Sequence, residues 1–449
     1  MPHLTVAGVG GSQVDVLIGT PQNASIAGQL LSMITNQVAD GNLTPYEYNG
    51  IGPLDAPTGP GYLIVTGPGF VAPPANTPDI VDVAKGPVLL MGGNAASQVV
   101  VSDGPLTYYA NSGVGTVVAS GGDATIITDP TGGGDHLFLT DGSNNRILAL
   151  SGNDSIYAGP GRNSIVLGSG NDLVVVTGHD SITAGSGNDT VDVLRGNAIV
   201  QGGTGTLLFA NGDGSSTVFG GAGSDTITGG NGGGVYHGGS AGNNLLVGGL
   251  AATTLFGGGS GDTLIAEGSA NSKLIAGSGN ETLLGAGPGN DTFVGGSGAD
   301  SMMGGFGRNT FIGGSGGGTM TGGAGGNIYA FADGNNQGGS NQGGGDRGQD
   351  GGDGRDHGDG HGHDGEHDHG RGHDHQQPGA FANEGQGSFV VTDFTQGVDK
   401  IDLLGGGEDA VKAALASQTV AGGNVTITLQ DNTKVTFLGI THLDHGSFG

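Results

Sequence analysis

Acidic side chains recur at a regular spacing through the middle of the chain. Asp154 and Asp172 lie eighteen residues apart, and Asp172 and Asp189 lie seventeen apart. Each follows a glycine-rich stretch and comes shortly before a large apolar residue. Calcium binds six to eight oxygen atoms at about 2.3–2.6 Å, supplied by carboxylates and backbone carbonyls. Because a tight glycine turn directs carbonyls inward beside each carboxylate, the spacing predicts a series of calcium sites.

The predicted ligands share the sixth place of a nine-residue unit, G-G-x-G-x-D-x-U-x, in which U is a large apolar residue. Residues 220–228 and 295–303 match this unit without a departure. The acids at the sixth place are Asp154, Asp172, Asp180, Asp189, Asp225, Asp262, Glu281, Asp291 and Asp300. Weaker neutral oxygen donors stand there at Asn163, Asn309 and Asn327.

The apolar U residues define the elements that must position these acids. They recur every eight to ten residues, at Ile147, Ile156, Ile165, Val174, Ile182, Val191, Ile199, Leu208, Val218, Ile227, Tyr236, Leu246, Leu255, Leu264, Leu274, Leu283, Phe293, Met302, Phe311, Met320 and Tyr329. Each x-U-x triplet predicts a short strand, and each glycine-rich half predicts a turn with positive φ. Two units make a coil of about eighteen residues, and stacking buries the U residues. The sequence therefore predicts an all-β fold, a parallel β-roll or β-solenoid.

One alternative interpretation and one departure from the pattern limit the prediction of calcium sites. Gly-Asn-Asp triplets also form good turns without any metal. Around residues 231–258 the sixth places hold Gly234, Asn244 and Thr253. Calcium is not expected there, and those coils are predicted to depend on apolar packing by Leu245, Leu246, Leu255 and Phe256.

These units resemble the repeats-in-toxin (RTX), or haemolysin-type calcium-binding, family. The resemblance extends over about residues 145–331, and a looser version continues upstream at 116–118, 125–127 and 136–138. It implies a calcium-stabilised β-roll with several bound ions. We expect the solenoid as a whole to occupy residues 89–332.

The composition agrees with a solenoid outside the cytosol. Glycine accounts for 104 of 449 residues, cysteine and tryptophan are absent, and the formal net charge is −29. Such a charge opposes compaction unless cations neutralise it. It also argues against nucleic acid as a partner, because nucleic-acid-binding proteins present basic patches. Without disulfide bonds, bound calcium is the expected source of stability.

Residues 1–88 carry the weakest pattern. Residues 22–39 predict an amphipathic helix, and residues 61–65 and 80–83 predict strands. We expect a small cap over the first coil, with a docking or binding module as the alternative. The segment shows no Sec-type signal peptide. Neither this segment nor the rest of the sequence contains a run of 18 apolar residues, the length that would span a membrane.

Residues 381–449 differ from the repeats. The pattern D-F-x-x-G-x-D-x-I-D-L at 393–403 is followed by a predicted helix at 409–416, a hairpin around Asp431 and Asn432, and a terminal Gly-Ser-Phe-Gly. These features resemble the C-terminal module of RTX proteins exported by type I secretion, in which an ABC exporter reads an uncleaved C-terminal address. The resemblance implies secretion. A cap that closes the solenoid end is the alternative, and the two roles are compatible.

Residues 333–380 form a composition break that is rich in glycine, aspartate and histidine. Almost no apolar side chain is present, so we expect a flexible linker. A solvated spacer is the plain interpretation, and loose binding of zinc, nickel or copper is the alternative. The weak transition-metal ligands would be His361, His363, His367, His369, His373 and His375.

These features predict a secreted calcium-binding solenoid with a structural or adhesive role at the cell surface or in an extracellular matrix. Expected partners are calcium, a type I ABC exporter, and either a surface polysaccharide or further copies of the chain. No catalytic constellation emerges, so we expect no enzymatic activity. The alternatives are an RTX enzyme or toxin with an unrecognised N-terminal active module, and a transition-metal buffer that works through the histidine-rich linker.

Overall fold

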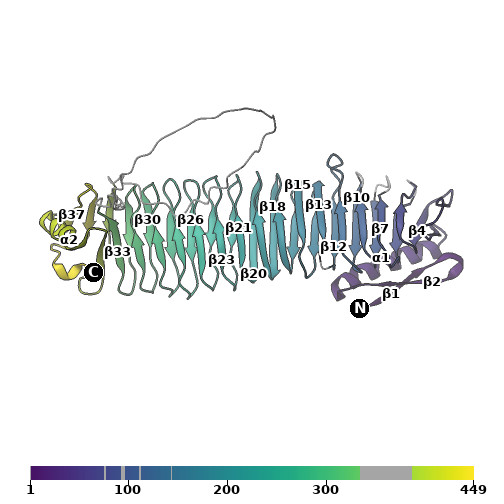
Figure 1. Ribbon diagram of the computed structural model, residues 1–449, viewed down its shortest axis with the longest axis horizontal. Helices are drawn as coiled ribbons and strands as arrows, with labels where there is room; N and C mark the ends of the chain where they lie inside the picture. The colour runs from purple at the N-terminus through teal and green to yellow at the C-terminus, as the bar shows by residue number, and fades with distance from the viewer. Residues whose placement is uncertain (1, 75–76, 93–96, 111–112, 143, 334–386) are drawn as a thin grey trace, which may run out of the picture.

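The computed structural model describes residues 2–74, 77–92, 97–110, 113–142, 144–333 and 387–449, which form one long parallel β-solenoid (Figure 1). Two sheets run along its length, and the chain contributes strands to them alternately. The predicted all-β solenoid is confirmed. The histidine-rich segment, with His361, His363, His367, His369, His373 and His375, lies outside the described residues.

Sheet 1 is parallel up to its last two strands, which are antiparallel. Its strands are, in order, β3 (Thr44–Tyr48), β4 (Gly61–Val65), β6 (Asp79–Asp82), β8 (Ser97–Ser102), β10 (Val114–Ala119), β12 (His136–Thr140), β14 (Ser155–Ala158), β16 (Leu173–Val176), β18 (Asn188–Arg195), β20 (Thr206–Asp213), β22 (Thr226–Thr228), β24 (Leu245–Val247), β26 (Thr263–Ala266), β28 (Thr282–Gly285), β30 (Asp300–Met303), β32 (Gly318–Thr321), β34 (Ser388–Val391), β38 (Lys434–Phe437), β37 (Asn424–Thr428) and β36 (Thr419–Ala421).

Sheet 2 is parallel throughout. Its strands are, in order, β5 (Gly69–Val71), β7 (Val88–Met91), β9 (Leu106–Tyr109), β11 (Ala124–Ile127), β13 (Arg146–Ser151), β15 (Ser164–Ser169), β17 (His179–Thr183), β19 (Asn197–Gln201), β21 (Ser216–Phe219), β23 (Gly234–His237), β25 (Thr253–Phe256), β27 (Lys273–Ile275), β29 (Thr292–Val294), β31 (Thr310–Ile312), β33 (Ile328–Ala332) and β35 (Lys400–Leu404).

The core is a single column of apolar side chains between the two sheets. All but two of the predicted U residues are buried in it, and Ile156, Val174 and Val191 stack on one another in sheet 1. The register predicted at Ile199 and Leu208 is wrong by one residue. Val200 and Phe209 are the buried residues, whereas Ile199 and Leu208 face outward and are 57% and 49% exposed.

The middle coils also differ from expectation in which side chains fill the core. Leu246 and Leu255 are fully buried, as predicted. Leu245 and Phe256 alternate with them along β24 and β25 and lie on the outer faces. This follows from the period-two alternation of a strand, since two neighbouring residues cannot both point inward.

Columns of glycine allow the turns of successive coils to stack closely. A Cβ added to Gly170 would lie 1.8 Å from the carbonyl oxygen of Gly152, one coil earlier. Gly170 also has a φ of 139°, a conformation that side-chain-bearing residues rarely adopt. The repeat therefore needs glycine here for space as well as for backbone conformation.

The N-terminal residues form a lateral module rather than an end cap. Helix α1 (Pro21–Ala39) begins after Thr20, whose hydroxyl accepts a hydrogen bond from the Asn23 N–H, and it packs on the hairpin of β1 (His3–Ala7) and β2 (Gln13–Leu17). A short 3-10 turn (Val9–Gly11) joins these two strands. The module covers the outer face of sheet 1 from β4 to β12.

The solenoid itself starts earlier than the expected boundary at residue 89, because β3 to β7 already belong to the two sheets. The regular period is missing there for a physical reason. The module buries the outward side chains of β4 and β6, so both faces of these strands are apolar and the alternation disappears.

The C-terminal residues extend the solenoid instead of forming a separate module after a linker. Strand β34 pairs with β32, and β35 pairs with β33. Phe389, Val391 and Ile401 continue the buried column. Helix α2 (Gly407–Ala416), the antiparallel strands and a 3-10 turn (His445–Ser447) then close the end. In the described part of the chain, no helix has the length and apolar character of a membrane span.

Candidate calcium sites

The sixth-place residues form two parallel ladders, one at the start of the strands of each sheet. Ladder 1 leads into sheet 1 and contains His136, Asp154, Asp172, Asp189, Leu207, Asp225, Asn244, Asp262, Glu281 and Asp300. Ladder 2 leads into sheet 2 and contains Asn145, Asn163, Asp180, Ala198, Ser216, Gly234, Thr253, Ser272, Asp291, Asn309, Asn327 and Asp399.

Each ladder is held by hydrogen bonds from backbone to side chain between coils. The N–H of Asp154 donates to Oδ1 of Asp172 at 2.7 Å, and the N–H of Asp172 donates to Oδ1 of Asp189 at 3.1 Å. Ladder 2 repeats the arrangement, with the N–H of Asn163 donating to Oδ1 of Asp180 at 2.9 Å. An oxygen at the sixth place therefore has a structural role even without a metal.

The second carboxylate oxygen has a partner in some units and none in others. Oδ2 of Asp225, Asp262 and Asp300 accepts from a glycine N–H of its own turn at 2.7–2.8 Å. At the sixth places, the buried carboxylate oxygens without a hydrogen-bond partner are Oδ2 of Asp154, Asp172 and Asp291 and both oxygens of Glu281. A buried, unpaired carboxylate oxygen is unfavourable, so each of these atoms requires a cation or a proton.

Burial and repulsion shift the acidity of these groups. Burial raises the pKa of Asp172 to about 7, and the neighbouring carboxylates of Asp189 and Asp154 add to the rise. Burial likewise raises the pKa of Glu281, and the adjacent Asp300 carboxyl reinforces the shift. In the absence of a metal the folded solenoid therefore favours the protonated forms of Asp172 and Glu281.

Consecutive acids occur in ladder 1 at two places. The first acid run is Asp154, Asp172 and Asp189, and the second acid run is Asp262, Glu281 and Asp300. Leu207 separates Asp189 from Asp225, and Asn244 separates Asp225 from Asp262. In ladder 2, Asp180 lies between Asn163 and Ala198, and Asp291 lies between Ser272 and Asn309. The structure thus brings together only part of the predicted ligand set.

Several ladder residues were not predicted from the sequence, and His136 and Asp399 are the two that carry titratable side chains. His136 starts ladder 1, and its Nδ1 lies 3.0 Å from Oδ1 of Asp154. The sequence feature that could have identified His136 is its sixth place in a nine-residue unit, after the glycines at 132–134. Asp399 ends ladder 2, where its Oδ1 accepts from the Asn327 N–H at 2.7 Å. It escaped because the long segment before β34 interrupts the nine-residue period.

The donor set suits calcium better than a transition metal. Among the described residues, no three His, Cys, Asp or Glu side chains converge on a point that could hold a metal. Two carboxylates from neighbouring coils, completed by turn carbonyls, provide hard oxygen ligands only. The stacked glycine columns bring such carbonyls next to each acid run, as at Gly152 and Gly170.

Comparison with known families agrees with this geometry. Six stretches, of which the last two overlap, match the family described as RTX calcium-binding nonapeptide repeat (4 copies), at residues 139–174, 176–205, 211–235, 238–272, 275–311 and 285–320. This part of the chain therefore consists of RTX-type calcium-binding repeats. The comparison with curated proteins gave no match. Both acid runs lie within the RTX repeats, whereas the N-terminal module, the first coils and the C-terminal coil lie outside them.

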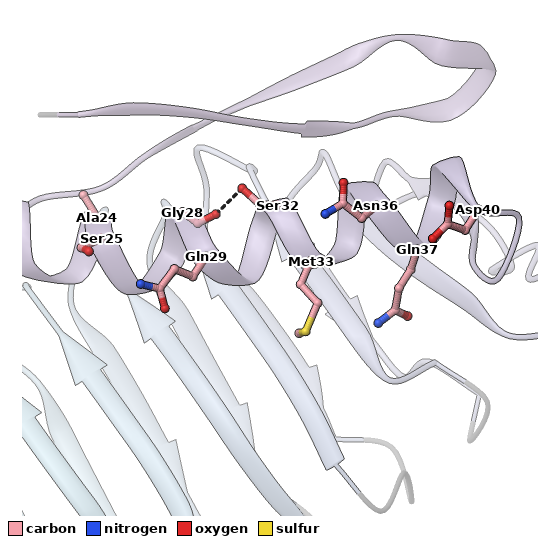
Figure 2. Close-up of a pocket in the computed structure, with 9 residues that line it drawn as sticks. All are labelled: Ala24, Ser25, Gly28, Gln29, Ser32, Met33, Asn36, Gln37 and Asp40. Atoms are coloured by element: carbon pink, nitrogen blue, oxygen red, sulfur yellow. Dashed lines mark hydrogen bonds between the residues drawn. The ribbon is translucent and has the colours of Figure 1, made fainter.

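A groove of about 750 Å³ lies on the N-terminal module, away from both acid runs (Figure 2). It follows one side of α1, where Ala24, Gly28, Ser32 and Asn36 recur every fourth residue. Among its lining residues only Asp40 carries a titratable side chain. The groove therefore offers no acid–base pair.

Proposed function

We propose that this protein is a secreted scaffold whose RTX solenoid is completed by calcium, with a structural or adhesive role and no enzymatic activity. The observation that carries the proposal is the buried acid run with unpaired oxygens, as at Asp154 and Asp172. Calcium sites of extracellular modules typically bind in the 10⁻⁴–10⁻³ M range. Such concentrations occur outside cells, which supports a secreted protein.

The proposal assigns calcium to the gaps between coils within each acid run. Asp154, Asp172 and Asp189 would supply the carboxylates of the first run, and Asp262, Glu281 and Asp300 those of the second. Bound calcium would neutralise the repulsion between neighbouring acids and give the unpaired oxygens a partner. The isolated acids of ladder 2, such as Asp180 and Asp291, would bind more weakly because the next coil offers a neutral group.

Calcium titration by calorimetry tests this assignment. Asp172→Asn and Glu281→Gln should each lower the number of bound ions, because each removes the middle carboxylate of an acid run. The matched control is Asp180→Asn in ladder 2, which should leave the number of tightly bound ions unchanged. Equal losses in all three variants would contradict the assignment to ladder 1.

The export part of the proposal rests on the resemblance of residues 381–449 to type I secretion modules. The hypothesis is tested by fusing these residues to a passenger protein in a host with a working type I exporter. The passenger should reach the medium with the module uncleaved. The same passenger fused to residues 275–320 should stay inside, and equal export of both fusions would contradict the role of the module.

A further inference from the structure

The outer face of sheet 2 lacks acidic side chains over a great length. From β5 to β31 its outward side chains include no aspartate or glutamate, in a chain with 41 acidic residues. Charged side chains on this stretch are Arg146 and Lys273. From β5 to β31 this face is thus free of acids.

Strand register arranges the outward residues of sheet 2 in two rows. One row is apolar over much of its length and includes Met91, Tyr109, Ile127, Leu148, Val166 and Phe219. The neighbouring row is rich in hydroxyls, with Thr107 beside Thr125 and Ser164 beside Ser181. Further along the apolar row, the rings of Phe219, His237 and Phe256 stack at 4.8 and 4.3 Å between centroids.

In the first coils, the apolar outer face of sheet 1 is buried by another part of the chain, whereas that of sheet 2 is exposed. On sheet 1, the N-terminal module buries Tyr62, Ile64 and Val81. On sheet 2 of the same coils, Phe70 and Met91 are 58% and 39% exposed. Exposed apolar patches of this kind mark sites of association.

We propose that the outer face of sheet 2 is an interface at which a second copy of this chain packs face to face. The strands repeat about every 4.8 Å, so the face from β5 to β31 is roughly 65 Å long and about 10 Å wide. Two such faces would bury on the order of 1,300 Å² in total, which falls within the size of stable interfaces. A second copy has the same spacing between strands, so its rows of outward side chains would meet these rows at every coil.

Electrostatics and shape both favour sheet 2 over sheet 1 as the contact. Each copy carries a formal charge of −29, so two copies can approach closely only where acids are absent. Sheet 1 presents Asp192 on its outer face. Its first coils are also covered by α1 and the β1–β2 hairpin, which prevents a flat contact along its full length.

The inference presupposes the calcium-loaded fold of the proposed function, and the test keeps the two apart. Light scattering with size-exclusion chromatography measures the mass of the full chain in calcium, and circular dichroism measures folding in the same samples. The expected mass is twice 43.6 kDa. A folded protein that remains monomeric across the micromolar range would overturn the interface while leaving the calcium scaffold intact.

Charged substitutions locate the contact. Met91→Lys combined with Ile199→Lys places two charges on the outer face of sheet 2 and should reduce the mass to that of a monomer. The matched control is Leu208→Lys with Met303→Lys on the outer face of sheet 1, where these residues are 49% and 48% exposed. The control should remain dimeric. A dimer that survives the sheet 2 charges, or is lost with the sheet 1 charges, would overturn the proposal.

Discussion

At the scale of single residues, the sixth-place acid makes two opposite contributions to the stability of the fold. Its Oδ1 accepts an inter-coil hydrogen bond, as Asp172 does from Asp154, and this stabilises the stack. Its charge is buried beside other charges and opposes folding unless a cation is bound. Replacing an acid by its amide separates the two effects, because the hydrogen-bonded oxygen remains and the charge is lost.

Asp172→Asn should therefore change stability in opposite directions with and without calcium. In calcium the variant should unfold more easily, by roughly 1–3 kcal/mol, because a ligand that binds only the folded state is lost. In excess chelator it should be more stable than the wild type, because a repelling charge is removed. Urea unfolding in both conditions measures the change. Asp192→Asn on the outer face of β18 is the control and should be neutral in both.

The raised acid pKa values predict how the calcium-free protein responds to pH. The unfolded aspartate has a pKa near 3.9. Burial and neighbouring acids raise the pKa of folded Asp172 to about 7. The folded state then holds its proton more tightly, so this contribution to stability is full below about pH 4 and is lost as the pH rises through about 7. Unfolding in chelator at pH 5, 6 and 7 should show falling stability, and a rise would contradict the argument.

At the scale of elements, the glycine columns set how closely the coils can stack. Gly170→Ala should destabilise the solenoid by more than about 1 kcal/mol, because its φ is 139° and an added Cβ would meet the Gly152 carbonyl. Gly59→Ala is the matched control, since its φ is not positive and its Cβ would meet nothing within 4 Å. Thermal unfolding in calcium compares the two variants. Equal stability would show that the turns have room that the structure does not indicate.

The C-terminal coil is fixed to the solenoid by the residues of the motif that resembles a secretion signal. Oδ1 of Asp399 accepts from the Asn327 N–H, and its Oδ2 accepts from the Thr395 N–H at 2.7 Å. Asp399→Ala should destabilise this end by roughly 1–3 kcal/mol, because buried N–H groups lose their partners. Hydrogen exchange at β33 and β35 measures the effect. Asp402→Ala, which alternates with the buried face of β35, is the control and should leave exchange unchanged.

The elements also show where sequence reasoning succeeds and where it fails. The period was predicted well where an acid or asparagine marks the sixth place, as at Asp154 and Asn309. The predicted register is wrong by one residue at Ile199 and Leu208, because Ala198 and Leu207 stand at the sixth places in that region instead of an acid or asparagine. The division into two ladders was not foreseen, although it follows from the coil length. The role of Asp399 depended on a pairing across the long segment between β33 and β34, which no local pattern encodes.

At the scale of the whole molecule, the two acid runs divide the solenoid into regions that differ in their dependence on calcium. The coils between Asp189 and Asp262 hold a single ladder 1 acid, Asp225, and Leu246 and Leu255 pack at their centre. Chelation monitored by hydrogen exchange should deprotect the coils of the two acid runs first. Uniform deprotection would show that the coils unfold as one cooperative unit.

The central claim is that calcium completes the fold of this acidic RTX solenoid. Circular dichroism together with small-angle X-ray scattering on the full chain, in calcium and then in excess chelator at neutral pH, tests it most directly. The account predicts that chelation reduces the β signal and increases the radius of gyration, and that added calcium restores both. An unchanged spectrum and radius in excess chelator would contradict it.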